Sequence, residues 1–175
     1  MAVLYFRNKG YKPVDAPRLR ETLRTLLGSS NTSINVRVSP KYVEVSASGV
    51  ELDTLVEASS KLLGEPPIEA SGSSEGLSSY THLIREEKYW EAHEALEAVW
   101  SRNRDKGLQT LILAAAALAK AQEGNPRGAL KILERLKKIQ DELGEAIVDI
   151  ECVRRKIEVV FNGGEGRLEE CIRLE

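Results

Sequence analysis

The residues best suited to chemistry lie between positions 88 and 100, where His93 is followed by Glu94 and Glu97. On a helix, an imidazole and a carboxylate four residues apart can meet, and this spacing also suits two ligands of one metal ion. The same pair could pass a proton to or from a substrate. We therefore take His93, Glu94 and Glu97 as candidate catalytic residues, and His93 and Glu97 as candidate metal ligands.

A structural role for these side chains is the competing interpretation, and we favour it. A zinc site needs at least three protein ligands, whereas the chain has two histidines, the other being His82. A buried carboxylate needs a partner, which His93 or Gln109 could supply in a hydrogen-bonded network. We accordingly expect no cofactor, and a divalent metal only if the catalytic interpretation holds.

The spacing of apolar residues predicts the helix that carries this site. Tyr89, His93, Leu96 and Trp100 recur at intervals that place them on one side of a helix. We expect this side to pack against the core. His93 would then be partly removed from water, with Glu97 beside it.

Helical patterns continue through the rest of the chain. Short loops that contain glycine separate them and imply antiparallel neighbours in an up-and-down bundle. Asn125 is expected to cap the helix that begins at Pro126. The predicted helices span residues 77–86, 88–103, 106–123, 126–142, 145–161 and 166–174.

Residues 1–64 follow a different pattern. Alternating apolar and polar residues predict strands, two apolar stripes predict helices, and the order reads β-α-β-β-α. A right-handed first crossover should make the first two strands parallel, and the step at Pro40 suits an antiparallel hairpin between the second and third. Both helices should cover one face of the sheet.

A stretch rich in Pro, Gly and Ser separates the two patterns at residues 65–76. We therefore predict an α+β fold, in which a small β-α-β-β-α domain at residues 1–64 is joined by this linker to an all-α antiparallel helical bundle at residues 77–175. A domain as small as the first is marginal alone, so we expect it to dock on the rest of the chain or on a second copy.

Three sequence stretches together resemble the prokaryotic family named "domain of unknown function 309": residues 91–100, the Ala-rich run at 111–118, and residues 124–129. The resemblance covers about residues 78–140. It implies a small helical bundle with no established activity. The characteristic positions of the family fall on Glu91, His93, Glu94, Glu97, Trp100, Gln109, Asn125 and Arg127.

The chain departs from that family pattern at two places. Members often carry one or two histidines just after the Ala-rich run, where this chain has Ala119 and Lys120, and usually a glycine where it has Glu87. Loss of the second histidine weakens the case for a shared metal or acid–base site.

Bulk composition limits the remaining functions. Charged residues make up 30% and hydrophobic residues 42% of the chain, and the net charge is −2, so neither nucleic acid nor a membrane surface is favoured. No apolar run reaches the roughly 18 residues that span a bilayer, and no signal-peptide pattern opens the chain, so we expect a cytoplasmic protein. Sparse Asn and Gln beside abundant Glu, Lys and Arg lean toward a thermophile.

Two cysteines, Cys152 and Cys171, fall in the predicted C-terminal helices. Buried thiols are the expectation there, although an intracellular disulfide would be less unusual in a thermophile. The sequence leaves their pairing open.

The first 48 residues carry eight Lys or Arg against three acids, a local charge of +5, with Tyr5, Tyr11 and Tyr42 interspersed. A basic sheet with exposed aromatics could stack single-stranded RNA bases. Residues 49–70 add five acids and one lysine, which brings the region to +1, so we favour a solvated charged face.

The sequence thus favours a non-enzymatic interaction or scaffold protein that contains a buried His/Glu network and that self-associates or binds a protein partner. The alternative is a metal-assisted or acid–base enzyme using His93 with Glu94 or Glu97. A further alternative is RNA binding through the basic N-terminal domain. Whether the chain is an enzyme stays open, because no reaction or substrate follows from these residues.

Overall fold

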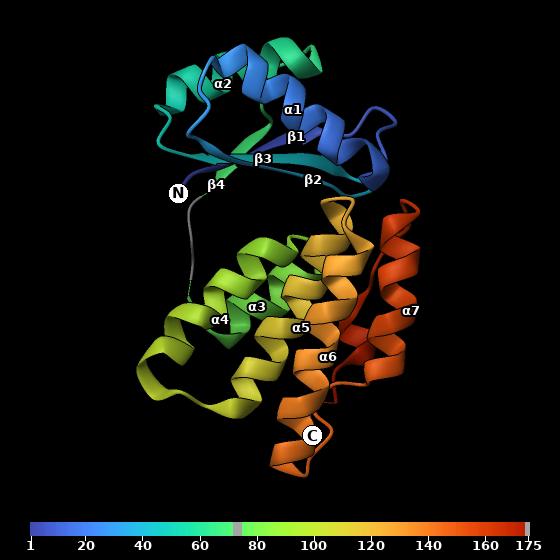
Figure 1. Ribbon diagram of the computed structural model, residues 1–175. Helices are drawn as coiled ribbons and strands as arrows, with labels where there is room; N and C mark the ends of the chain where they lie inside the picture. Colours follow the sequence, from blue (N-terminus) through green and yellow to red (C-terminus); the bar gives the residue numbers. More distant parts are fainter. Residues whose placement is uncertain (72–74, 174–175) are drawn as a thin grey trace. The chain divides into compact units, whose positions relative to one another are not determined.

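The computed structural model describes residues 1–71 and 75–173, which divide into two compact units (Figure 1). The first unit contains the described residues up to 71 together with 122–124, and the second contains the others. An antiparallel sheet near the N-terminus is followed by a run of helices, so the predicted α+β class is confirmed. No helix among the described residues is long and apolar enough to cross a membrane.

The first unit is a four-stranded antiparallel sheet with two helices on one face (Figure 1). The strands lie in the order β2-β3-β1-β4. Its elements are β1 (Val3–Arg7), a 3-10 turn (Pro13–Asp15), α1 (Ala16–Leu27), β2 (Ser33–Val38), β3 (Tyr42–Ser48), α2 (Leu52–Leu63) and β4 (Glu69–Ser71).

Alternation along the strands builds the core of this unit. Leu4 and Phe6 on β1 and Val45 on β3 point to the helix-covered face, where they meet Leu19 and Leu23 of α1 in one apolar cluster. The residues between them on the strands point to the opposite face. The predicted placement of both helices on one face therefore follows from the strand pattern.

Two features of the sheet differ from the sequence-based expectation. β3 lies between the first two strands, so β1 and β2 run parallel to each other, as predicted, without being neighbours. The predicted linker at residues 65–76 contains β4, which pairs antiparallel with β1, with Leu4 opposite Ala70. A polar, proline-containing stretch can still donate a short edge strand, because an edge strand has one unpaired side.

The second unit is helical. Its elements are α3 (Leu77–Arg85), α4 (Tyr89–Asn103), α5 (Lys106–Gln122), α6 (Pro126–Leu143), α7 (Ile150–Phe161) and a 3-10 turn (Leu168–Cys171). The Ala-rich run of α5 lies at the centre of a large apolar cluster, with Ala114, Ala115 and Ala117 fully buried. Small side chains there let neighbouring helices approach α5 closely.

The two predicted C-terminal helices are shorter than expected. The helix predicted at 145–161 begins only at Ile150, where the Asp149 carboxylate accepts a hydrogen bond from the backbone N–H of Cys152 at 2.9 Å. Within the described part of the helix predicted at 166–174, which ends at residue 173, only the 3-10 turn Leu168–Cys171 is helical. Just beyond it, Ile172 forms an isolated β-bridge with Val148, which holds both segments out of helical geometry.

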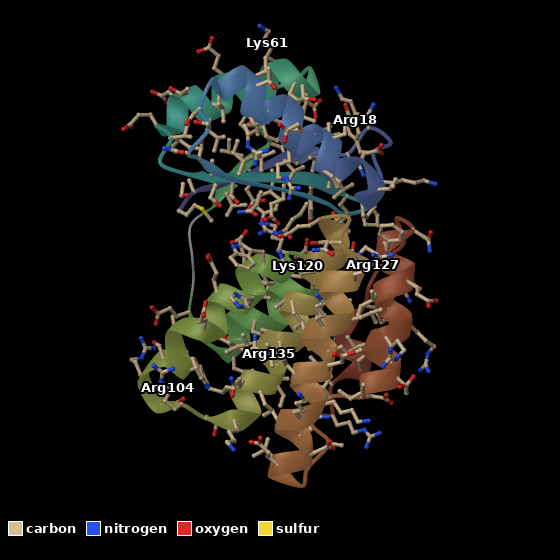
Figure 2. All side chains as sticks on the ribbon, in the orientation of Figure 1. Arg18, Lys61, Arg104, Lys120, Arg127 and Arg135 are labelled. Carbon is tan, nitrogen blue, oxygen red and sulfur yellow. A yellow bond between two sulfur atoms is a disulfide. The ribbon has the colours of Figure 1, made fainter. Side chains whose placement is uncertain are left out.

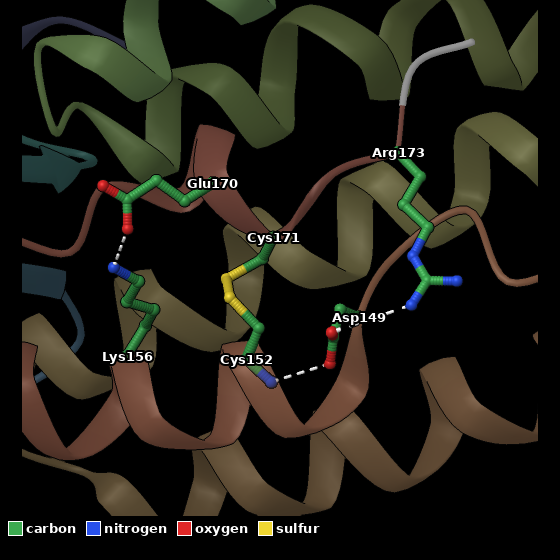
Figure 3. Close-up of a disulfide and its surroundings, with 6 residues drawn as sticks. All are labelled: Asp149, Cys152, Lys156, Glu170, Cys171 and Arg173. Atoms are coloured by element: carbon green, nitrogen blue, oxygen red, sulfur yellow. Dashed lines mark hydrogen bonds and ion pairs between the residues drawn. A yellow bond between two sulfur atoms is a disulfide. The ribbon is translucent and has the colours of Figure 1, made fainter.

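Cys152 and Cys171 form a disulfide with their Cα atoms 5.4 Å apart, so the expectation of buried thiols is wrong (Figure 3). The disulfide joins α7 to residues 165–173, which we call the C-terminal strap. Backbone hydrogen bonds reinforce the join, from Asp149 N to Cys171 O at 2.8 Å and from Arg173 N to Ile147 O at 2.8 Å. The strap is therefore fixed to the bundle at its far end.

Candidate functional site

Helix α4 divides the predicted site residues between two environments. Its buried residues are Tyr89, Glu91, Ala92, Ala95 and Leu96. His93, Glu94 and Trp100 are half-buried, and Glu97 is exposed. The acid on the packed face is therefore Glu91 rather than Glu97.

His93 lies between an aromatic ring and an acid. Its imidazole stacks on Trp90, with ring centroids 4.7 Å apart and planes inclined by 14°. Its Nδ1 is 3.7 Å from Glu97 Oε2, which is within range of an ion pair but too long for a hydrogen bond. The two groups that the sequence placed together thus lie close, at the rim of the packed face rather than inside it.

No group of three or more His, Cys, Asp or Glu side chains within residues 1–71 and 75–173 is placed to hold a metal ion. His93 and Glu97 accordingly find no third ligand there. His82 is exposed on α3. Any catalysis at this site would therefore use His93 as the group that gains or loses a proton, with Glu97 beside it.

Other motif positions have identifiable structural roles. The Asn125 side chain accepts a hydrogen bond from Gly128 N at 2.8 Å and so caps α6, as predicted. Trp100 packs against the apolar core of the second unit, and the Arg104 guanidinium lies 4.3 Å from the centroid of its ring. Gln109 is half-buried on α5, and Arg127 is exposed on α6.

Glu87, in the turn between α3 and α4, has a structural role that its departure from the family glycine did not reveal. Its backbone has a φ of 60°, in the left-handed region, and its side chain is buried. Its Oε1 accepts a hydrogen bond from Gly166 N at 2.6 Å and lies 3.4 Å from the Tyr89 hydroxyl oxygen. A carboxylate from the turn thus satisfies a buried backbone N–H at the start of the strap.

Gly166 fits this contact because it has no side chain. A Cβ at this position would lie 2.1 Å from the Tyr89 hydroxyl oxygen, which no real side chain could accept. Burial, and then the nearby Glu87 carboxylate, raise the pKa of Tyr89 well above its ordinary value. The family glycine expected at position 87 was the available signal, since glycine marks positions that need a positive φ.

Four of the nine basic residues of the first unit form ion pairs with acids. Tyr5 and Tyr42 pack edge to face on the strands, with centroids 5.4 Å apart, while Arg18 and Lys61 lie on α1 and α2 (Figure 2). Such pairing lowers the charge available to a phosphate backbone, and RNA binding stays a prediction. The ion pairs join Lys9 to Glu65, Arg18 to Asp15, Arg24 to Glu21, and Arg37 to Glu44.

The comparison with protein families identifies one segment. The model of the family described as "Domain of unknown function (DUF309)" matches residues 77–132, from α3 into α6, and no family matches the N-terminal part. The matched segment contains every motif position from Glu91 to Arg127, so the resemblance inferred from these residues is confirmed. No curated protein and no solved structure is significantly similar to the chain.

Proposed function

We propose that this chain, which carries a DUF309 segment at residues 77–132, is a non-enzymatic interaction module that pairs with a second copy of itself through α4. The observation that supports the proposal is the cluster of Glu97, Trp100 and Arg104 on one side of the helix end. Trp and Arg are the residue types most enriched at the energetic centres of protein interfaces.

The order of charges along this cluster is self-complementary. Glu97 and Trp100 lie three residues apart on α4 and share a face. The Arg104 guanidinium, just past the helix end, lies over the Trp100 ring. In an antiparallel pair of α4 helices that cross near Trp100, Glu97 of one copy lies opposite Arg104 of the other, and symmetry repeats the contact. Glu97 and Arg104 are both exposed, so each can reach a partner.

Packing of Trp100 gives the proposed interface a rigid centre. Its ring rests on the core and is covered by the Arg104 guanidinium, so little side-chain freedom is lost on association. Arg104 itself has a left-handed φ of 56° at the end of α4, which fixes the direction in which the chain leaves the helix. Side chains that are already ordered in the free protein lower the entropy cost of forming the dimer.

Charge reversal tests this arrangement. Sedimentation velocity up to about 200 µM protein should show a dimer for the native chain, and monomers for Glu97→Arg and for Arg104→Glu, because each reversal sets like charges opposite one another. Mixing the two variants should restore a dimer, since each then meets its opposite. Glu134→Arg, an exposed acid on α6, is the matched control and should leave the dimer intact.

Two results would contradict the proposal. One is a native chain that stays monomeric throughout this concentration range. The other is a dimer that is insensitive to both reversals and to Trp100→Ala, which would place the interface elsewhere.

A second candidate function is catalysis at His93, supported by the 3.7 Å approach of its Nδ1 to Glu97 Oε2. Here His93 would exchange a proton, with Glu97 or Glu94 stabilising its charged form, and a divalent metal is one form of this proposal. Metal analysis of the purified protein and of His93→Ala separates the functions. Stoichiometric metal that disappears in the variant would favour the enzyme.

The proposed setting is the cytoplasm of a thermophilic prokaryote. The composition supports a thermophile, and the disulfide agrees with a cytoplasmic setting only in such an organism, because intracellular disulfides persist mainly there. A midpoint of thermal unfolding above about 90 °C would agree with this setting, and one near about 50 °C would contradict it.

A further inference from the structure

The C-terminal strap, residues 165–173, covers part of the apolar core of the second unit. Leu168 is fully buried in the same apolar cluster as Tyr80 and Ile84 of α3. The 3-10 turn that contains Leu168 packs against both α3 and α7. The strap therefore removes an apolar side of α3 from water, and its departure would expose that side.

Packing between the strap and α3 is incomplete. A cavity of about 130 Å³ lies between them, with Tyr80 and Ile84 among the wall residues from α3 and with Glu169 and Ile172 from the strap. Atoms that face a cavity lack the dispersion contacts of a filled core. This boundary therefore holds the strap less firmly than close packing would.

The disulfide between Cys152 and Cys171 is the covalent join between the strap and α7. Weaker contacts lie beside it, and Figure 3 shows the ion pairs among them. Ion pairs between exposed side chains add little stability, so the disulfide dominates the attachment. The weaker contacts are two backbone hydrogen bonds of 2.8 Å, from Asp149 N to Cys171 O and from Arg173 N to Ile147 O, and the ion pairs of Lys156 with Glu170 and of Arg173 with Asp149.

We propose that Cys152 and Cys171 form a redox switch that controls access to this side of α3. A dithiol reduces the disulfide in the folded protein, the end of the strap leaves α7, and Tyr80 and Ile84 become accessible to solvent. Reoxidation closes the strap again. The bundle stays folded throughout, because the Ala-rich run of α5 forms the centre of its core.

Reduction follows the ordinary course of thiol–disulfide exchange. Cys152 is half-buried and Cys171 is buried, so a thiolate of the dithiol attacks Cys152 Sγ, and Cys171 leaves as a thiolate that takes up a proton. The second thiol of the dithiol then displaces Cys152 and closes a cyclic disulfide, which passes two electrons and two protons to the protein. Cys152 lies in the first turn of α7, where the helix N-terminus stabilises the departing thiolate.

The first measurement is reduction of the full chain under native conditions. Dithiothreitol, a dithiol, is added in excess, free thiols are blocked with iodoacetamide, and mass spectrometry identifies the blocked cysteines. Both Cys152 and Cys171 should be blocked while the helical circular dichroism signal is retained. A disulfide that resists dithiothreitol until urea unfolds the protein would overturn the proposal.

Hydrogen exchange measured by mass spectrometry then locates the opening. Amides of the strap, including those of Ile172 and Arg173, should exchange at least about tenfold faster in the reduced protein, whereas those of α6 should not change. Equal exchange of the strap in both redox states would overturn the proposal. A similar acceleration of α5 and α6 would also overturn it, because a switch must open locally.

A dye that binds apolar surface measures the exposure of α3. Fluorescence of bound anilinonaphthalene sulfonate should rise at least about twofold when the protein is reduced, because the strap no longer covers Tyr80 and Ile84. Unchanged fluorescence after complete reduction would contradict the exposure that the proposal requires.

Variants separate the disulfide from the contacts beside it. The strap of Cys152→Ser/Cys171→Ser should exchange as fast as that of the reduced native chain, with or without dithiothreitol. Lys156→Gln is the matched control, because it removes an ion pair beside the disulfide and keeps the covalent bond. Its strap should exchange as slowly as that of the oxidised native chain.

The variants can also overturn the proposal. Slow exchange in the double serine variant would do so, and so would an opening in Lys156→Gln as large as that caused by reduction. The reduced native chain carries the same comparison without any substitution, so the test does not depend on the stability of the serine variant.

Discussion

Glu87 precedes His93 in the sequence and Glu97 follows it, and the two carboxylates differ in burial: Glu87 is buried and Glu97 is exposed. The turn before α4 buries Glu87 against the strap, where it accepts a hydrogen bond from Gly166 N at 2.6 Å. The middle of α4 leaves Glu97 in water, where it approaches His93 loosely. The difference teaches that motif spacing identified the exposed acid, while the buried acid that accepts a backbone hydrogen bond lies in the turn.

The largest expected effect comes from Glu87→Ala. Loss of the carboxylate leaves the buried Gly166 N–H without its acceptor, so the free energy of unfolding should fall by about 3 kcal/mol. Urea denaturation of the two proteins measures it. Glu87→Gln retains an acceptor oxygen and should lose less than half as much; a loss as large as that of the alanine variant would point to charge rather than hydrogen bonding.

Gly166→Ala disturbs the contact between Glu87 and Gly166 at the Gly166 side. The new Cβ would meet the Tyr89 hydroxyl oxygen, so we expect a loss of about 2 kcal/mol in the free energy of unfolding. Combining it with Tyr89→Phe, which removes that oxygen, should recover part of the loss in a double-mutant cycle. Strict additivity of the two changes would show that they do not act through one contact.

Alkaline pH should destabilise the folded protein through Tyr89, the first residue of α4. Burial raises the pKa of Tyr89, so the folded state keeps the phenol neutral while the unfolded state ionises near its ordinary value of 10.0. The stability is fully present below that value and is lost as pH rises above it, by about 1.4 kcal/mol per pH unit for this tyrosine. Denaturation between about pH 8 and about pH 11 should show a shallower decline of the free energy of unfolding for Tyr89→Phe than for the native chain.

Asn125→Ala should have a smaller effect. The side chain satisfies one backbone N–H at the start of α6, so its removal should lower the free energy of unfolding by about 1 kcal/mol. Asn125→Ser keeps a side-chain oxygen that can cap the helix. Its free energy of unfolding should lie within about 0.5 kcal/mol of that of the native chain. A much larger loss for both would imply a further role of this motif position.

Glu97→Ala should have the smallest effect on folding. Its carboxylate is exposed and its contact with His93 is long, so the change in the free energy of unfolding should stay below about 0.5 kcal/mol. Chemical denaturation beside Glu87→Ala makes the comparison direct. A loss above about 1 kcal/mol would mean that the pair is structurally coupled after all.

Much of this architecture could be predicted from the sequence, because apolar residues that recur with the period of a helix or a strand give that element one face to bury. The α4 stripe, the Asn125 cap and the α+β class follow from local patterns. The non-adjacent β1 and β2 and the edge strand β4 could not be predicted, because strand order depends on long-range pairing. The two C-terminal segments differ from the prediction because a disulfide and a single β-bridge override the helical preference of residues 145–149 and 166–173.

In the candidate site, too, local contacts could be predicted from the sequence and long-range contacts could not. Spacing alone brought His93 close to Glu97, because both lie on one helix. It could not reveal that Glu87 meets Gly166, since 79 residues separate them and no local pattern reports such a contact. For the same reason, the cavity beside Glu169 became visible only in three dimensions.

The disulfide also determines how the chain would respond to mechanical force. Cys152 and Cys171 are separated by 19 positions, so a pull on the C-terminus is transmitted to α7 through a covalent bond instead of through the hydrogen bonds of the strap. Under oxidising conditions the enclosed loop adds no length when the bundle is stretched. Reduction of the disulfide would let the enclosed segment extend by about 60 Å under force.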